Sequence, residues 1–322
     1  FVLEGVDADD WSGYSVSSAG DVNGDGYADM LISAPHADPN GTNSGETYVV
    51  FGKSGSFGAS VDLGALDGSD GFVLSGIDAG DRLGNSVSTA GDVNGDGYDD
   101  ILIAAYGADE RAGETYVVFG KNGSFDASVG LGTLNGTNGF VLRGIAAWDY
   151  SGRSVSTAGD INGDGYDDIL IGAQGADPGG DDLAGETYVV FGKATGFSAS
   201  MDLSTLDGTN GFVLRGIEAG DALGISVSTA GDVNSDGYAD LLIGSPYAND
   251  HAGETYLVFG KATGFSASMD LLTLDGTNGF VLSGIGAGDN LGDSVSTAGD
   301  VNGDGYDDML IGALRADSGG AS

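Results

Sequence analysis

Short apolar runs recur along the chain, and each is bounded by glycine and polar residues. One kind reads Ile-Leu-Ile, as at residues 101–103, and another reads Tyr-Val-Val-Phe, as at residues 116–119. Runs that are apolar on both alternating faces are typical of strands covered on each side by a neighbouring sheet. No stretch keeps the apolar period of an amphipathic helix. The pattern therefore predicts an all-β chain with little helix.

The apolar runs belong to a repeat of about 70 residues whose start is marked by Phe-Val-Leu. Four strand candidates recur per repeat, as at residues 86–89, 101–104, 114–120 and 140–144. This period is longer than that of most solenoids and suits a four-stranded propeller blade with one long connection. We therefore predict a β-propeller of four-stranded blades. The markers are Phe1, Phe72, Phe140, Phe212 and Phe280.

The repeat divides the chain into five units, of which the last is truncated. They cover residues 1–71, 72–139, 140–211, 212–279 and 280–322. We favour one propeller domain of five blades, the fifth incomplete, within a longer protein. A fragment of a larger ring remains an alternative, as does an open array completed by a neighbouring copy, because an unpaired edge strand invites pairing between chains.

A loop rich in acidic residues lies between the first and second predicted strand of every unit. Its second copy reads Asp-Val-Asn-Gly-Asp-Gly-Tyr-Asp-Asp at residues 92–100. Positions 1, 3, 5 and 9 offer side-chain oxygens, position 7 offers a backbone carbonyl, and glycine at position 6 permits a sharp turn. Oxygen donors without sulfur or imidazole suit Ca²⁺. A solvated Asx turn would explain one such loop, but five at the same place favour five calcium ions, one per loop.

The predicted calcium ligands occupy the same positions in each loop. They are Asp21, Asn23, Asp25, Tyr27 and Asp29; Asp92, Asn94, Asp96, Tyr98 and Asp100; Asp160, Asn162, Asp164, Tyr166 and Asp168; Asp232, Asn234, Asp236, Tyr238 and Asp240; and Asp300, Asn302, Asp304, Tyr306 and Asp308. An EF-hand would need glutamate at position 12, followed by a helix. Position 12 is isoleucine in all five loops, and an apolar strand follows position 9. The EF-hand interpretation therefore fails.

Composition narrows the classes of partner. The chain has 49 acidic and 10 basic residues, a net charge of −39, and 40% hydrophobic residues. Such a chain repels nucleic acid and anionic membrane surfaces, so we expect neither as a partner. It has no cysteine, which excludes thiol catalysis, cysteine–zinc sites and disulfides. No apolar stretch is long enough to span a bilayer, so we expect no membrane insertion.

Three motifs together resemble the FG-GAP repeat. They are Gly84-Asn-Ser-Val, the acidic loop at residues 92–100, and Ser33-Ala-Pro-His. FG-GAP repeats are the blade units of the integrin alpha-chain β-propeller and also occur in secreted or surface proteins of bacteria. The resemblance implies Ca²⁺ in the five loops, on one face of the propeller, and an extracellular or cell-surface location. Leucine replaces the phenylalanine of the motif at residues 83, 223 and 291, which weakens any expectation of integrin-like ligand recognition.

We expect a non-enzymatic, calcium-binding module for adhesion or surface assembly, with no catalytic residues. Its binding surface would be the loops that differ most between units, at residues 34–45, 105–112, 174–184, 245–252 and 313–322. Its ligand, a protein or glycan, is not identified by the sequence. Trp11 and Trp148 occupy similar positions after an outer strand, and packing between blades is favoured for them over a platform for a sugar ring.

Two alternatives to this function remain. A polysaccharide lyase or hydrolase would need histidine, tyrosine and arginine clustered in one pocket, whereas His36 and His251 lie in variable loops. A subunit of a surface filament or layer would self-assemble by strand exchange through the incomplete fifth blade. One recurrent glutamate precedes the third strand and is interpreted as structural, either capping a loop or approaching the ion. Its copies are Glu46, Glu114, Glu186 and Glu254.

Overall fold

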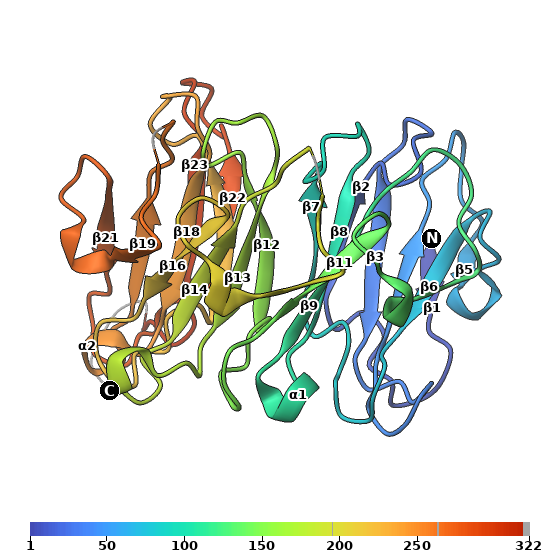
Figure 1. Cartoon of the computed structure of the whole chain (residues 1–322), viewed down its shortest axis with the longest axis horizontal. Coiled ribbons are helices and arrows are strands. Elements are labelled where there is room, and N and C mark those ends of the chain that lie inside the picture. The colour runs from blue at the N-terminus through green and yellow to red at the C-terminus, as the bar shows by residue number, and fades with distance from the viewer. Residues whose placement is uncertain (195, 263, 318–322) are drawn as a thin grey trace. The chain divides into compact units, whose positions relative to one another are not determined.

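The computed structural model describes residues 1–194, 196–262 and 264–317 (Figure 1). The chain divides into two compact units, which are described separately. The first comprises Phe1–Ala147 and Lys193–Leu203, and the second comprises Trp148–Gly192 and the chain from Ser204 onward. In the described residues, both consist of short strands, mostly antiparallel, joined by turns and single-turn helices. The predicted all-β class is confirmed.

The first unit contains two five-stranded sheets and one two-stranded sheet. The first sheet has the order β10-β6-β4-β3-β2, the second β15-β11-β9-β8-β7, and the third pairs β1 with β5. The strands are β1 (Val2–Glu4), β2 (Val16–Gly20), β3 (Asp29–Ala34), β4 (Glu46–Val50), β5 (Ser60–Asp62), β6 (Gly71–Ser75), β7 (Val87–Gly91), β8 (Asp100–Ala105), β9 (Glu114–Val118), β10 (Ser128–Gly130), β11 (Gly139–Arg143) and β15 (Ser200–Asp202).

The second unit contains sheets of five, four and two strands. Their orders are β12-β13-β14-β16-β20, β17-β18-β19-β21 and β22-β23. The strands are β12 (Ser154–Gly159), β13 (Asp168–Ala173), β14 (Glu186–Val190), β16 (Gly211–Arg215), β17 (Ser226–Gly231), β18 (Asp240–Ser245), β19 (Glu254–Val258), β20 (Ser268–Asp270), β21 (Gly279–Ser283), β22 (Leu291–Gly299) and β23 (Asp308–Ala313).

The helices are one turn long and lie in connections. The α-helical turns are α1 (Ala108–Arg111) and α2 (Ala248–His251), and the 3₁₀ turns are η1 (Leu63–Ala65), η2 (Leu131–Thr133), η3 (Pro178–Gly180), η4 (Leu203–Thr205) and η5 (Leu271–Thr273). Within the described part of the chain, no helix is long and apolar enough to pass through a lipid bilayer.

The sheets of four and five strands have the strand order predicted for a propeller blade. In the second sheet, β7 pairs with β8, β8 with β9 and β9 with β11, all antiparallel. Every residue of β8 is buried, as expected for a strand covered on both faces. A β-bulge at Gly91, where φ is 70°, sets Asp100 opposite that glycine. The bulge recurs in each repeat and brings the end of the acidic loop back to the innermost strand.

A further strand was not predicted. In three sheets, a three-residue segment pairs in parallel with the fourth strand, which itself begins the following sequence unit. The segment Ser-x-Asp or Ser-x-Gly is too short and too exposed to show an apolar alternation, so its sequence pattern does not distinguish it from a long connection. The blades of these three sheets therefore take three strands from one sequence unit and their fourth and fifth strands from the next.

The antiparallel pairing fixes which loops share an end of the blade. The acidic loop joins the end of β2 to the start of β3, whereas the connection before β2 and the loop after β3 meet at the other end. There the backbone N–H of Gly13 donates to the carbonyl of Ser33 over 2.8 Å, and that of Ser15 to the Ser33 hydroxyl over 2.9 Å. The predicted calcium loops and the variable loops therefore lie at opposite ends of each blade.

Candidate functional site

The acidic loop is held open by hydrogen bonds from its own backbone to its carboxylates. In the loop of residues 92–100, the N–H groups of Asp96 and Gly97 donate to the two oxygens of Asp92 over 3.0 and 2.8 Å. The N–H of Tyr98 donates to Asp96 over 3.1 Å. These bonds fix the side chains at positions 1 and 5 against the backbone of their own loop.

The same bonds recur in the other four loops. The carboxylate at position 1 accepts hydrogen bonds from the backbone N–H groups of positions 5 and 6. The residues at position 1 are Asp21, Asp160, Asp232 and Asp300. Position 5 accepts from the tyrosine at position 7 in each of these loops. The residues predicted as ligands thus occupy one repeated loop conformation, which is set by the glycines and by the order of the oxygen donors.

The carboxylate at position 9 closes each loop and, in the first four repeats, ties it to the sheet. One oxygen of Asp100 accepts from Val93 within the loop over 3.1 Å, and the other accepts from Gly120 beyond β9 over 2.9 Å. Its side chain has no exposed surface, and the same is true of Asp168 and Asp240. Two of the carboxylate's lone pairs are thereby used, and the remaining lone pairs are available to a cation.

Burial makes the charged form of these carboxylates unfavourable. The pKa of Asp100 and Asp168 is raised to about 8. Burial is the largest cause, the charges of the other two aspartates of each loop add to it, and backbone N–H donors oppose it. The pKa of Asp29 and Asp240 is raised to about 6, with burial again the largest cause. A positive charge at the loop centre would oppose both effects.

The donor chemistry of each loop fits a hard divalent cation. Three carboxylates, one amide oxygen and one backbone carbonyl are all oxygen donors of the kind that Ca²⁺ prefers. In the described residues, however, no three acidic or histidine side chains lie close enough together to form a metal-binding group by themselves. The loop scaffold is therefore formed, while the carboxylates point at backbone N–H groups rather than at one shared centre.

An aspartate of the next repeat also contacts the loop and was missed by the sequence analysis. An oxygen of Asp99 accepts from the backbone N–H of Asp21 over 2.7 Å. In the second unit, Asp307 accepts from Asp232 in the same way over 2.8 Å. The sequence signal for this contact was the pair of adjacent aspartates that ends the loops carrying Asp99 and Asp307. In the first repeat, Ala28 stands where the first aspartate of that pair would be. Only the contact between repeats shows what the extra carboxylate does.

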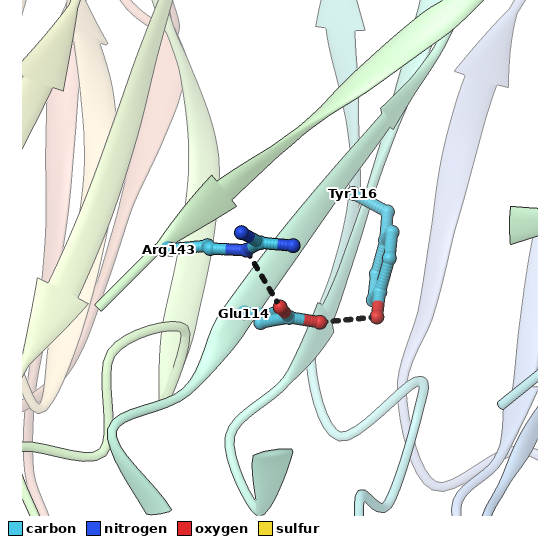
Figure 2. A network of polar contacts seen from close by, with 3 residues as sticks. All are labelled: Glu114, Tyr116 and Arg143. Carbon is cyan, nitrogen blue, oxygen red and sulfur yellow. Dashed lines mark hydrogen bonds and ion pairs between the residues drawn. The ribbon is translucent and has the colours of Figure 1, made fainter. Parts of the chain in front are cut away.

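The recurrent glutamate before the third strand belongs to a separate polar network (Figure 2). Glu114 accepts a hydrogen bond from the Tyr116 hydroxyl and a 3.2 Å ion pair from Nε of Arg143. Because Glu114 pairs with Ala105 at the end of β8 that is remote from the acidic loop, it does not approach the predicted ion. The possibility that this glutamate approaches the ion is therefore wrong, and its structural rather than catalytic role stays a prediction.

Replacing Tyr116 by phenylalanine should cost about 1.5–3 kcal/mol, because a hydrogen bond to a charged partner is lost at a buried ring. Replacing Arg143 by methionine should cost less than about 1 kcal/mol, because its side chain is 52% exposed and the pair is screened by water. The position equivalent to Arg143 is occupied by serine in two other sheets, at Ser75 and Ser283. Urea unfolding of both variants measures the difference; an arginine variant less stable than the tyrosine variant would contradict this ranking.

A cavity of about 380 Å³ lies beside this network in the first unit. Glu114, Tyr116 and Arg143 line it together with Asp78, Asp81 and Asp109. Its lining therefore includes a tyrosine and an arginine of the kind that the enzymatic alternative needs, but no histidine. Burial raises the pKa of Tyr116, and the Glu114 charge raises it further, which is opposite to what a tyrosine base requires. The equivalent tyrosines also donate to glutamates at Glu46, Glu186 and Glu254, as expected for a repeated structural element.

Aromatic side chains gather at the variable-loop end of the first blade, from the connection before β2 and from the loop after β3. The rings of Trp11 and His36 lie 4.0 Å apart, and those of Trp11 and Tyr14 lie 5.9 Å apart. Trp11 is 55% exposed and Tyr14 is 48% exposed, so the predicted burial of Trp11 between blades is wrong. The backbone N–H of His36 donates to the carbonyl of Asp10 over 3.2 Å, which joins the two loops that carry the cluster.

The two tryptophans are not equivalent positions. Trp11 corresponds to Tyr150 of the third repeat, and both have positive φ, at 60° and 55°. Trp148 is 56% exposed and corresponds to Asp9. The variable loops elsewhere also carry aromatic or basic groups, including Tyr247 beside His251, with rings 5.2 Å apart. Residues 318–322 of the last predicted variable loop lie outside the described residues.

Sequence comparison defines the class of protein. The FG-GAP repeat matches residues 12–50, 83–118, 151–190, 223–258 and 291–322, which together make up more than half of the chain. The first four matches run from the connection before the innermost strand to the third strand of a blade. The chain therefore belongs to the FG-GAP repeat family, and its fold is that of an integrin alpha-like β-propeller with five repeats, as the sequence analysis predicted.

Individual relatives include integrin alpha chains. Integrin alpha-V of Gallus gallus is 30% identical over 246 residues, which cover 73% of this chain and 20% of the integrin. Integrin alpha-4 of Xenopus laevis is 32% identical over 156 residues, covering 48% of this chain and 14% of the integrin. Phosphatidylinositol-glycan-specific phospholipase D of Bos taurus is 32% identical over 168 residues, covering 51% of this chain and 19% of that protein. The chain spans a fifth or less of each relative's length.

Proposed function

We propose that this chain is a calcium-stabilised, extracellular β-propeller module for adhesion or surface assembly, in which repeats 1–71 to 280–322 act as one domain. The observation that carries the proposal is the fivefold recurrence of one oxygen-rich loop with the same internal hydrogen bonds. Position 9 additionally ties each of the first four loops to the residue after the third strand of its blade. Membership of the FG-GAP repeat family supports the assignment.

In this proposal, five Ca²⁺ ions bind, one per loop. The aspartates at positions 1, 5 and 9, the asparagine at position 3 and the carbonyl at position 7 supply the oxygens, and the ion offsets the repulsion among the three carboxylates. Backbone N–H groups hold the carboxylates in place before binding. Because the folded loop binds the ion and the unfolded chain does not, binding energy adds to folding energy. Extracellular calcium lies within the affinity range of such modules.

The proposed binding surface is the variable-loop end of the blades. Trp11, Tyr14 and His36 give it exposed aromatic area, and loops on a rigid scaffold are where specificity usually resides. The partner is a protein or glycan on a surface outside the cell. Integrin alpha chains, to which the chain is similar, support the adhesion class. The net charge of −39 disfavours nucleic acid and anionic membranes.

A screen against arrays of glycans and extracellular proteins, in calcium, tests this surface. We expect a ligand whose binding falls at least about tenfold with Trp11→Ala, as for other central aromatic contacts, without a change in melting temperature. Leu310→Ala is the matched control, since Leu310 is 61% exposed but lies in the middle of β23, outside the variable loops. Ligand binding that survives the loop variant but not the control variant would contradict the proposal.

The enzymatic alternative rests on the relative named as a phospholipase D and on the acidic cavity at Glu114. We propose that the chain itself is not an enzyme, because the cavity's tyrosine is held by a glutamate and the same arrangement recurs in four blades. Incubating the chain with acidic polysaccharides and with phospholipids, and measuring released products, distinguishes the two. Turnover that Tyr116→Phe abolishes would establish an enzyme instead.

A further inference from the structure

The acidic loops of neighbouring repeats are hydrogen-bonded to each other. In the first unit, the first loop (residues 21–29) offers three backbone carbonyls to N–H groups of the second repeat. The donors are Asp99, Lys121 and Gly123, at 3.3, 2.9 and 3.0 Å, and the acceptors are Asp21, Val22 and Asn23, in that order. One edge of the first loop is therefore held by the main chain of the repeat that carries the second loop.

The last three residues of the second loop (residues 92–100) contact the two loops in alternation. Tyr98 is position 7 of its own loop, but its ring covers Gly24 of the first loop, where a Cβ would lie 2.4 Å from the ring carbon Cε1. Asp99 accepts from the backbone N–H of Asp21 over 2.7 Å. Asp100 closes its own loop at position 9. A change in the conformation of this three-residue segment therefore alters contacts in both loops.

The Asp99 carboxylate acts on the main chain of a predicted calcium ligand. Asp21 is position 1 of the first loop, and its side chain accepts from the N–H groups of Asp25 and Gly26. By holding the N–H of Asp21, Asp99 fixes the backbone from which that side chain projects. Gly20 leaves room for this contact, because a Cβ there would lie 2.2 Å from Oδ2 of Asp99.

The second unit contains the same joint once with the carboxylate and once without it. Asp307 accepts from Asp232 over 2.8 Å and so joins the fourth loop to the fifth. A Cβ on Gly231 would lie 2.2 Å from the Asp307 carboxylate, as at the first joint. Between the third and fourth loops the equivalent residue is Ala239, whose N–H donates to the carbonyl of Asp160 over 3.2 Å. Alanine has no side-chain acceptor, so this joint is made by the main chain alone.

We propose that Asp99 and Asp307 are positioning residues that couple calcium binding in the two loops that each of them joins, the first with the second and the fourth with the fifth. The proposal rests on the calcium sites proposed above. An ordered second loop keeps Asp99 on the N–H of Asp21, which keeps position 1 of the first loop in its binding conformation. Less conformational freedom is then lost when the first loop is occupied. The coupling is reciprocal, so each pair of loops responds to calcium more steeply than independent sites would.

Hydrogen-exchange mass spectrometry across a calcium series tests this coupling loop by loop. Protection of residues 22–27 gives the calcium midpoint of the first loop. Asp96→Ala disables the second loop, since Asp96 is its position 5 and accepts from Tyr98 within that loop. We expect this substitution to raise the first-loop midpoint at least about fivefold. In a chain that also carries Asp99→Ala, the same substitution should leave the midpoint unchanged. An equal rise in both backgrounds would overturn the proposal.

Asp99→Asn separates positioning from charge. The amide oxygen of asparagine can still accept from the N–H of Asp21, whereas the negative charge is lost. The rise caused by Asp96→Ala should therefore persist in the asparagine background, even if the midpoint itself changes. Loss of the rise in Asp99→Asn, as in Asp99→Ala, would show that the carboxylate acts by its charge and overturn the positioning role.

The joint between the third and fourth loops is the internal control. Asp236→Ala disables the fourth loop and should raise the midpoint of residues 161–166 by less than the factor found at the first joint, because Ala239 lacks the carboxylate. Ala239→Asp should increase that factor, since Gly159 precedes the third loop and leaves room for the new side chain. This variant adds a contact, so a gain does not depend on a weakened fold. Equal factors at both joints, unaltered by Ala239→Asp, would overturn the proposal.

Reciprocity gives a further check. Asp25→Ala disables the first loop and should raise the midpoint of residues 93–98 by the same factor as the reverse experiment, because coupling free energies are symmetric. Unequal factors would contradict an equilibrium coupling. Protection that depends on calcium in every loop but shows no coupling would overturn this proposal alone. Protection that is independent of calcium in every loop of the wild-type chain would overturn the calcium sites as well.

Discussion

Replacing Phe140 by alanine lowers the free energy of unfolding by about 3–5 kcal/mol, as for other fully buried phenylalanines. Phe140 is 1% exposed and stacks at 4.5 Å and 9° on Phe197, which precedes the covering strand β15. It also lies 5.8 Å from Phe119 of its own sheet. The substitution therefore leaves a cavity at the joint between a blade and its covering strand, where few side chains can move in.

Phe280→Ala is the matched control for this prediction. Phe280 occupies the same position in β21 but is half-buried, and among the described residues no ring stacks on it as Phe197 stacks on Phe140. Its removal should cost about half as much, because the transfer and cavity terms both scale with what is buried. Guanidinium unfolding of both variants measures the difference. Equal losses would show that the covering strand contributes nothing to the stability of a blade.

Asp168→Asn should lower stability by about 4–6 kcal/mol in calcium and by only about 1–3 kcal/mol in chelator. The loss in chelator arises because the two oxygens of Asp168 accept hydrogen bonds from the N–H groups of Gly192 and Ile161 over 2.9 and 3.1 Å. The single oxygen of an asparagine amide can accept only one of these bonds. In calcium, the loss of one calcium site adds to this, and it is worth about 2.7 kcal/mol at a free calcium concentration of 100 times the dissociation constant.

Asp207→Asn is the control for charge alone. Asp207 is an exposed aspartate that accepts from Thr209 over 2.8 Å in an outer turn, outside every acidic loop. Its substitution should change stability equally in calcium and in chelator. Thermal unfolding of both variants in the two conditions gives the comparison. If Asp168→Asn lost the same stability with and without calcium, its loop would not be a calcium site.

Much of the fold could be predicted because the strands of a blade are short, apolar and repeated. Residues 101–104 and 114–118 lie in β8 and β9 as expected, since both faces of these strands are buried. The three-residue covering strands could not be found from apolar alternation, because their stability comes from a neighbouring strand and from anchors on either side. Phe125 and Leu131, spaced six residues apart, were the available signal.

The acidic loops could be located from spacing alone, but their connections could not. The sequence orders the oxygen donors of residues 92–100 along the loop, and the structure gives them one repeated conformation. The sequence does not reveal that the Asp99 carboxylate accepts a hydrogen bond from the backbone of the preceding repeat's loop, because that contact depends on how one repeat packs on another. The exposure of Trp11 was also beyond sequence reasoning, since tryptophan is usually buried and its left-handed backbone turn is visible only in the structure.

The most direct test of the account is thermal unfolding of the chain across a series of free calcium concentrations, with a chelator as the zero point. If the five loops bind calcium in the folded state only, the melting temperature rises steadily with the logarithm of calcium concentration above the dissociation constant. The slope then reports several ions released on unfolding. A melting temperature that is the same in millimolar calcium and in chelator would contradict the claim that these loops are calcium sites that stabilise the propeller.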